Sequence, residues 1–101
     1  MAALTTIQII GPSMEPALHN NEVWLAKVGK QAKPGQVIAF WEPGRPELLV
    51  VKRISHATAE GWWVVADNPV GARDSEHYGV VPFDSVVARL WVRVRPMFRR
   101  S

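Results

Sequence analysis

The chain of 101 residues contains no cysteine. This absence excludes disulfide bonds, thiolate metal sites and a cysteine nucleophile. Long hydrophobic runs are also missing, because the apolar stretch at residues 1–10 stops at Gly11, short of the ~20 residues of a membrane-spanning helix. The stretch also lacks the basic start and long apolar centre of a signal peptide. We therefore expect a soluble, cytoplasmic protein without a transmembrane segment.

Helical periodicity is scarce as well. Only residues 13–19 have room for a helical turn, and Pro16 keeps that turn short. Short alternating or β-branched stretches, separated by turn residues, predict strands instead. They cover residues 6–10, 22–28, 36–41, 48–55, 61–66 and 86–95. A chain of this length forms one domain, so we expect residues 1–101 to be a small all-β domain with a coiled, partly closed sheet and little helix.

Positive charge exceeds negative charge by a formal +3, and much of the excess lies near the C-terminus. The last predicted strand alternates, and its expected core face consists of Val86, Ala88, Leu90, Val92 and Val94. The opposite face carries Trp91 and several arginines and continues into a basic tail at about residues 96–101, which includes Phe98. Such a surface suits peripheral contact with an anionic membrane or with nucleic acid. A solvated strand face is the simpler interpretation.

The first informative stretch is GPSMEPAL at residues 11–18, which interrupts an apolar strand and places Ser13 between two prolines. Gly, Pro and Ser are common turn residues, so a plain turn explains the stretch. A serine held on a rigid corner is also a candidate nucleophile. The eight residues alone do not distinguish the two interpretations.

The second stretch is LLVVKRIS at residues 48–55, in which Lys52 shares a strand face with Val50 and Ile54. A lysine on an apolar face either extends its ammonium to water or loses its proton, because burying an unpaired charge is costly. Desolvation lowers the pKa of an amine, and a neutral lysine near pH 7 is a general base. Ser13 and Lys52 therefore form a candidate Ser–Lys dyad.

The histidines offer a competing arrangement. Ser13, His77 and either Asp74 or Asp67 have the composition of a Ser–His–Asp triad, without a local sequence signature for it. No two histidines have the spacing of metal ligands, so we expect neither a metal site nor a cofactor. All three histidines are expected at the surface.

The third stretch is ADNPVGARDSEHYG at residues 66–79. Its Asp, Asn and Ser residues are typical of turns, where they bind backbone amides and organise loops. We expect this role for them even in an enzyme.

These three stretches, in this order, resemble the motifs of the signal peptidase I family and its LexA-like relatives, which are serine proteases with a Ser–Lys dyad. The serine motif, GxSMxPxL, is matched by Gly11, Ser13, Met14, Pro16 and Leu18. The lysine motif, VKR, is matched by residues 51–53, and a strand of the pGdvV type by residues 34–38. The third motif, GDN followed by DSRxxG, is matched by Asp67, Asn68, Asp74, Ser75 and Gly79. The resemblance covers residues 10–89.

The resemblance implies a fold of the LexA and signal-peptidase type, with Ser13 as the nucleophile and Lys52 as the general base. The backbone N–H of Ser13 would donate to the oxyanion, and Met14 would pack beneath the dyad. The resemblance gives supporting roles to Gly11, Pro16, Arg53, Asp67, Asn68, Asp74 and Ser75.

Four positions depart from the family pattern. Gly11 stands where some bacterial signal peptidases carry a second serine that assists the oxyanion hole. Ala66 replaces the usual glycine, and Glu76 replaces the usual arginine after DS. Ala72 occupies a position where relatives offer a hydroxyl to orient the lysine. These departures affect the tuning of the site and leave the dyad intact.

In size and architecture the chain looks most like the soluble maturation proteases of nickel-type superoxide dismutase. This implies a serine endopeptidase that binds a precursor in extended form and removes its N-terminal propeptide or leader, here from a nickel superoxide dismutase precursor. One alternative is a signal peptidase that docks on the membrane through its basic, aromatic tail. An inactive relative kept as an interaction domain and a basic β-barrel that binds nucleic acid are the others. Lys52 separates the last from the peptidases, because a nucleic-acid module presents its lysines outward.

Overall fold

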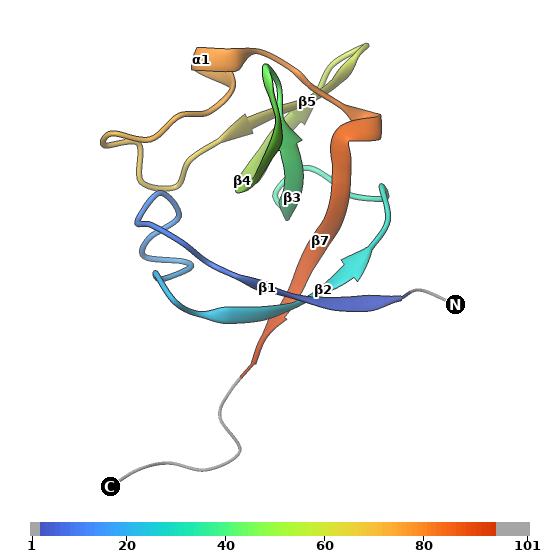
Figure 1. The fold of residues 1–101 in the computed structure, drawn as a ribbon. Helices are drawn as coiled ribbons and strands as arrows, with labels where there is room; N and C mark the ends of the chain where they lie inside the picture. The colour runs from blue at the N-terminus through green and yellow to red at the C-terminus, as the bar shows by residue number, and fades with distance from the viewer. Residues whose placement is uncertain (1–2, 95–101) are drawn as a thin grey trace, which may run out of the picture.

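The computed structural model describes residues 3–94, which form one antiparallel sheet of seven strands (Figure 1). The strands are β1 (Leu4–Gln8), β2 (Val23–Val28), β3 (Val37–Glu42), β4 (Arg45–Ala57), β5 (Gly61–Val65), β6 (Val81–Pro82) and β7 (Val86–Arg93). Helix is confined, within this part of the chain, to α1 (Ser75–Tyr78) and the 3₁₀ turn η1 (Phe83–Ser85). The predicted small all-β domain is therefore confirmed. No helix among residues 3–94 is long and apolar enough to cross a lipid bilayer.

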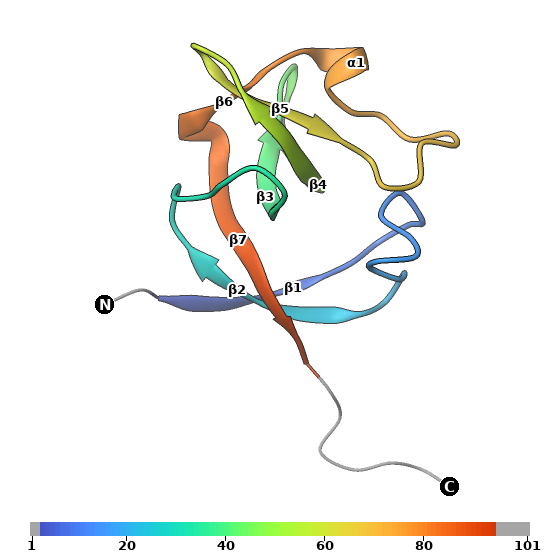
Figure 2. The same cartoon turned by 180° about the vertical axis from the view of Figure 1, so that it is seen from behind.

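The order of the strands in the sheet is β1-β2-β7-β3-β4-β5-β6. The last strand in sequence, β7, is thus inserted between β2 and β3. It connects the N-terminal pair β1 and β2 to the other strands in one sheet. In Figures 1 and 2, β1 and β2 cross one end of β7, while β3, β4 and β5 lie at its other end. The sheet coils around its core in this way, and β1 and β6 are left as its edges.

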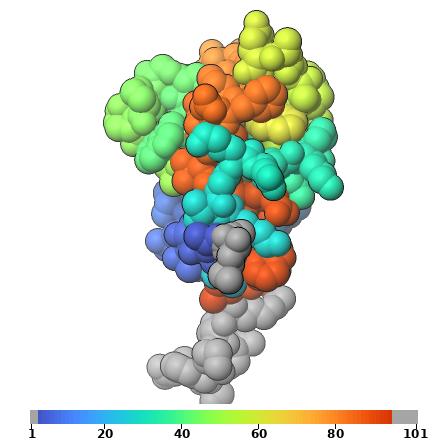
Figure 3. Space-filling view, turned by 90° about the vertical axis from the view of Figure 1, so that its right-hand side faces the viewer, coloured from blue at the N-terminus to red at the C-terminus, as the bar shows by residue number. Residues whose placement is uncertain are grey.

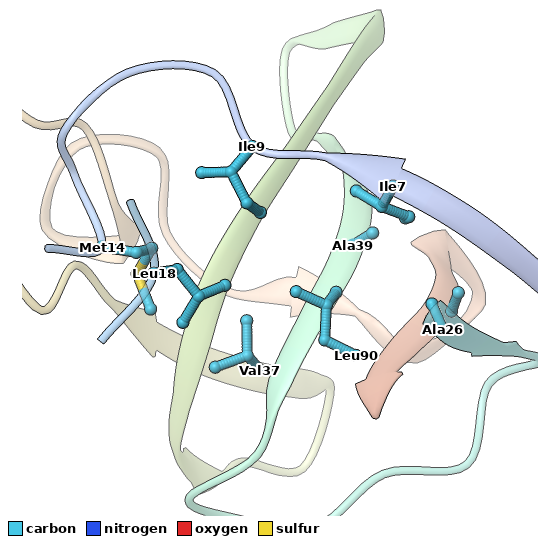
Figure 4. Close-up of a cluster of buried hydrophobic side chains, with 9 residues drawn as sticks. Ile7, Ile9, Met14, Leu18, Ala26, Val37, Ala39 and Leu90 are labelled. Carbon is cyan, nitrogen blue, oxygen red and sulfur yellow. The ribbon is translucent and has the colours of Figure 1, made fainter. Parts of the chain in front are cut away.

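The hydrophobic core consists of two clusters of buried side chains. The first cluster, drawn in Figure 4, contains Ile7, Ile9, Met14, Leu18, Ala26, Val37, Ala39, Ala88 and Leu90. The second contains Ile38, Phe40, Ile54, Trp62, Val64, Val81 and Val86. Successive residues of β3 alternate between the clusters, because neighbouring side chains of a strand point to opposite faces. Both faces of β3 are therefore buried, which places this strand at the centre of the fold.

Each of the six predicted strands is present, with ends that differ by a few residues. The strand β6 was not predicted, because it is two residues long and contains a proline. The expected single helical turn is present at residues 13–19, but the expectation that no other segment is helical is wrong. The turn at residues 13–19 is closed by a hydrogen bond from Leu18 N to Met14 O (2.9 Å). The α-helix lies at Ser75–Tyr78, where a reciprocal capping box between Asp74 and His77 starts it.

The alternation predicted for β7 holds through Leu90 and then ends. Val92 and Val94 were expected in the core, but each is 41% exposed. Beyond Arg89, β7 pairs with β2 and no longer with β3, and a bulge shifts the β2–β7 register around Trp91. The end of the strand therefore extends past the core. The predicted basic tail lies outside the described residues.

The space-filling view shows one outer face of the molecule (Figure 3). The green hairpin of β3 and β4 projects from one side of the molecule in that view. Its exposed apolar residues include Trp41, Leu48 and Leu49, each 40% exposed. This hairpin forms one wall of the groove described below.

Candidate active site

Ser13 lies on the turn that follows β1. The turn begins at Gly11, whose φ of +92° falls in the left-handed region that glycine adopts without strain. The N–H of Gly11 donates to Asn20 Oδ1 (2.7 Å). Met14 and Leu18, which are 1% and 3% exposed, insert from the turn into the first core cluster (Figure 4). Apolar packing on one side thus holds the serine at a fixed corner.

Lys52 comes from the middle of β4 and is 7% exposed. Its Nζ lies 3.3 Å from Ser13 Oγ and 3.2 Å from the carbonyl oxygen of Val51. Burial lowers the pKa of the Lys52 ammonium, while the nearby carboxylates of Asp74 and Glu42 raise it to a smaller extent. The fold thus brings together the serine and lysine that the sequence placed 39 residues apart.

The loop after β5 braces both partners. Asn68 N donates to Ser13 O (2.8 Å), and Asn68 Nδ2 donates to Pro12 O (3.2 Å). Asp67 accepts two hydrogen bonds from Arg53, from Nε (2.9 Å) and from Nη2 (2.7 Å). This forked ion pair raises the pKa of Arg53. Asn68 is therefore tied to the serine turn, and Asp67 to the strand that carries Lys52.

Asp74 and Ser75 hold the start of α1 against β5. Asp74 accepts from Ala66 N (3.1 Å) and from Glu76 N (3.0 Å). Ser75 Oγ accepts from Val64 N (2.8 Å). Asp74 thus combines a backbone-binding role with a position from which its charge reaches Lys52.

The departures from the family pattern have visible consequences. Glu76, which replaces the usual arginine, is exposed, and its side chain joins none of the ion pairs found among residues 3–94. Arg73 of the same loop instead pairs with the buried carboxylate of Glu42 (3.3 Å). The structure gives no hydroxyl role to Ala72, whose N–H donates to Pro69 O (3.2 Å).

Two further candidate residues, His77 and Pro16, make no contact with the dyad among the hydrogen bonds and ion pairs of the described residues. His77 Nδ1 accepts from Asp74 N (3.2 Å) within the capping box, so this ring is engaged at the helix. No hydrogen bond or ion pair among the described residues joins a histidine to Ser13. Pro16 is exposed, so it acts on the turn only through its backbone geometry.

A groove of about 250 Å³ opens beside Ser13 and Lys52, lined by Ile7, Gln8, Ile9, Ile10, Ser13, Met14, Leu48, Leu49, Val50, Val51 and Lys52. One wall is the edge strand β1. The other is the first half of β4, because β5 pairs with β4 only from Arg53 onward. The groove therefore lies between two strand edges, with the serine and lysine in its lining.

Backbone polar groups face this groove from both walls. Ile9 uses both its N–H and its C=O toward Glu22 and Asn21, at 2.8 and 2.7 Å. Because these groups alternate along an antiparallel strand, those of Gln8 point away from β2 and into the open edge. On β4, Ile54 bonds on the β3 side, so the groups of Val51 point to the groove. An extended peptide finds donors and acceptors on both sides.

Comparison with known proteins identifies the family. The profile of the Peptidase S24-like family matches residues 2–78, which is most of the chain. The chain belongs to the Peptidase S24-like family. This finding agrees with the peptidase family expected from the three motifs.

Two curated relatives of this S24-like chain are named as protease subunits. A protein of Xenopus tropicalis named mitochondrial inner membrane protease subunit 1 is 25% identical over 111 residues, covering 86% of this chain and 66% of the relative. The Mus musculus protein of the same name is 22% identical over 110 residues, covering 85% and 66%. The chain thus spans 66% of the length of each relative.

Neither Glu42 nor the open edge of β4 was predicted from the sequence. Glu42 ends an apolar run at a position that alternates with Phe40, which was a signal for a buried acid. Its partner Arg73 lies 31 residues away, and only the fold brings the two together.

Proposed function

We propose that this chain is a serine endopeptidase in which Ser13 is the nucleophile and Lys52 the general base. The observation that carries the proposal is the 3.3 Å separation between Lys52 Nζ and Ser13 Oγ in the lining of a groove between two strand edges. A serine needs an adjacent base to attack a carbonyl, and a buried amine supplies one once it is neutral. We further propose that residues 1–101 act as a single catalytic domain.

The proposed cleavage reaction starts from the lone pair on the neutral Lys52 amine. Neutral Lys52 donates one N–H to Val51 O and uses its lone pair to accept the proton of Ser13 Oγ–H. Oγ then bonds to the scissile carbonyl carbon, and the oxyanion accepts from the N–H of Ser13. The Lys52 ammonium gives its proton to the leaving amine as the C–N bond breaks. Water, deprotonated by Lys52, releases the acyl group and restores both residues.

The backbone N–H of Ser13 supports this assignment. It donates to none of the hydrogen bonds found among residues 3–94, whereas the Ser13 carbonyl is held by Asn68. Gly11 provides no hydroxyl, so the oxyanion would rely on this N–H and on solvent. One donor of this kind is worth about 10²-fold or more in rate.

For the substrate we propose the flexible N-terminal extension of a precursor protein, bound as an added strand along β1. A helix or a buried loop does not expose its backbone to the edges that line the groove. Cutting such an extension frees a new α-amine, which is a useful metal ligand. The resemblance to maturation proteases therefore leads us to propose a cytoplasmic nickel superoxide dismutase precursor as the substrate.

A second candidate is the signal peptidase that docks on a membrane and cuts leaders. The curated relatives, which are named as subunits of an inner membrane protease, favour its location at a membrane. One experiment compares the two candidates. Purified protein is incubated with the superoxide dismutase precursor and, separately, with a peptide bearing an Ala-x-Ala secretory site, with Ser13→Ala protein as the control. Sequencing of the product's new N-terminus identifies the cut. An intact precursor beside a cleaved leader peptide would overturn the maturation proposal and leave the membrane candidate.

The nucleic-acid alternative has little support. A nucleic-acid-binding module would present Lys52 outward, but this side chain is buried and points to Ser13. Trp91 is 47% exposed, but the ammonium of Lys27 covers its ring at 4.6 Å. The S24-like family match also favours a peptidase.

The rate of cleavage should depend on pH through Lys52. Burial lowers the pKa of this amine, and only its neutral form accepts the serine proton. We therefore expect kcat/KM to rise with pH through that lowered pKa and to level off above it. The check is a pH–rate profile on a substrate without ionisable groups. A rate that is flat or falls between pH 6 and 9 would contradict a lysine base.

Binding along β1 can be tested at Gln8, whose N–H points into the groove. Gln8→Pro removes this donor and leaves the β1–β2 ladder intact, as expected for proline on a strand edge. One lost hydrogen bond and the added ring should lower kcat/KM about 5- to 20-fold. Leu4→Pro is the matched control, because Leu4 has the same orientation on β1 and lies outside the groove. Equal effects of the two prolines would count against this binding mode.

A further inference from the structure

Glu42, at the end of β3, is a buried carboxylate with 3% of its surface exposed. Two arginines neutralise it: Arg45 Nε and Arg73 Nη2 each lie 3.3 Å from Glu42 Oε2. A carboxylate is retained in such a position only when charged partners offset the cost of its desolvation. The two arginines therefore supply the charged partners that a buried Glu42 carboxylate requires.

The pair with Arg73 joins two parts of the site. Arg73 immediately precedes Asp74, and its guanidinium also lies over the ring of Tyr78 at 5.9 Å. Tyr78 in turn packs edge-on against Phe40 of β3, with ring centroids 6.3 Å apart. The ion pair thus fastens the loop that carries Asp74 to the β3–β4 hairpin that carries Lys52.

Glu42 and Lys52 also lie on the same face of that hairpin. Ile38 is directly opposite Lys52 in the register of β3 and β4. Glu42 is buried like Ile38 and Phe40, with the exposed Trp41 between, although the β3–β4 register shifts at Trp41 and Glu42. Two carboxylates act on the Lys52 ammonium, from Asp74 beside α1 and from Glu42 on β3, and both oppose the effect of burial on its pKa.

The charged and titratable groups that act on Glu42 are those of Arg45, Arg73 and Tyr78. Together with Lys52, they form a single electrostatic cluster. Glu42 is its centre, since both arginines bind the same carboxylate oxygen.

We propose that Glu42 is a positioning residue for Lys52. It fixes the loop that carries Arg73 and Asp74, and it places a second buried carboxylate, besides that of Asp74, on the same side of the sheet as Lys52. The proposal rests on the Ser–Lys function proposed above. It predicts opposite electrostatic effects for the two members of the ion pair. Removing the Glu42 charge leaves two arginines uncompensated and makes Lys52 easier to deprotonate, whereas removing the Arg73 charge makes Lys52 harder to deprotonate.

The test compares Glu42→Gln and Arg73→Gln with wild type, with Glu42→Asp to retain the charge. Glu60→Gln is the matched control, because Glu60 is exposed in the β4–β5 turn and has no ion pair among the described residues. Two readouts need no substrate. One is an NMR titration of the Lys52 side chain, and the other is hydrogen exchange of Ala66 N–H, which reports the bond to Asp74.

We expect the Lys52 titration to move to lower pH in Glu42→Gln and to higher pH in Arg73→Gln, and Ala66 to exchange several-fold faster in both. Glu42→Asp should lie near wild type, and Glu60→Gln should be unchanged. On the acid limb, Glu42→Gln should retain a fraction of its maximal rate about three- to tenfold larger than that of wild type.

An unchanged Lys52 titration in both variants, or unchanged exchange at Ala66, would overturn the proposal. Should Glu42→Gln not fold, Arg73→Gln still tests it, because the Arg73 side chain is 44% exposed. Failure of the proposed peptidase function would be seen separately, as absence of cleavage by wild-type protein in which both readouts still respond.

Discussion

Ser13→Ala and Lys52→Ala should each reduce peptide cleavage by about 10⁴-fold or to background, since members of a catalytic unit fail together when either is removed. Alanine at position 13 removes the attacking oxygen, and alanine at position 52 removes the group that accepts its proton. Lys52→Arg should fail as well, because a guanidinium does not lose its proton near neutral pH. The measurement is kcat/KM on a precursor peptide at a pH above the acid limb.

Two substitutions of the same chemistry serve as controls for the dyad. Ser55→Ala removes an exposed hydroxyl that contacts His56 Nδ1 (2.9 Å), and Lys33→Ala removes an exposed ammonium; both should leave cleavage unchanged. Thermal unfolding checks that each protein folds. Loss of the Lys52 charge in Lys52→Ala should not lower the free energy of unfolding, because burying an ammonium costs desolvation energy. Full activity in a folded Ser13→Ala or Lys52→Ala protein would disprove the assignment.

Local sequence patterns predicted most of the sheet, since strand alternation and turn residues are properties of short segments. The same period of two placed Lys52 on an apolar face, and in the structure that side chain is buried. Alternation failed at Val92, where β7 no longer pairs with β3, and at Val94, which lies beyond the end of β7. A pattern in one strand carries no information on how far the adjacent strands extend.

The missing parts of the site depend on contacts between distant segments. Glu42 meets Arg73 across 31 residues, and the groove exists because β5 pairs with only part of β4. Neither arrangement leaves a local signal beyond a single charged residue at the end of an apolar run. The helix α1 was missed for a different reason: its four residues depend on the Asp74–His77 capping box and are too few to show a helical period.

Asp74→Ala should lower the free energy of unfolding by about 2–4 kcal/mol, through two losses at once. The α1 cap to Glu76 N contributes about 1 kcal/mol. The buried N–H of Ala66 would be left without its acceptor, which costs about 1–3 kcal/mol. The same substitution removes a carboxylate that raises the pKa of Lys52, so the acid limb of the rate should move to lower pH.

Asp74→Asn separates these two effects. Its amide oxygen can still accept one of the two backbone hydrogen bonds, so the loss of stability should be smaller than with alanine, while the shift of the acid limb should remain. Asp84→Ala is the control, because Asp84 is exposed in η1 and that turn has no side-chain cap. Denaturant unfolding and the pH–rate profile are the measurements. If Asp74→Ala were as stable as Asp84→Ala, Asp74 would not hold the loop; an unmoved acid limb in Asp74→Asn would show that its charge does not reach Lys52.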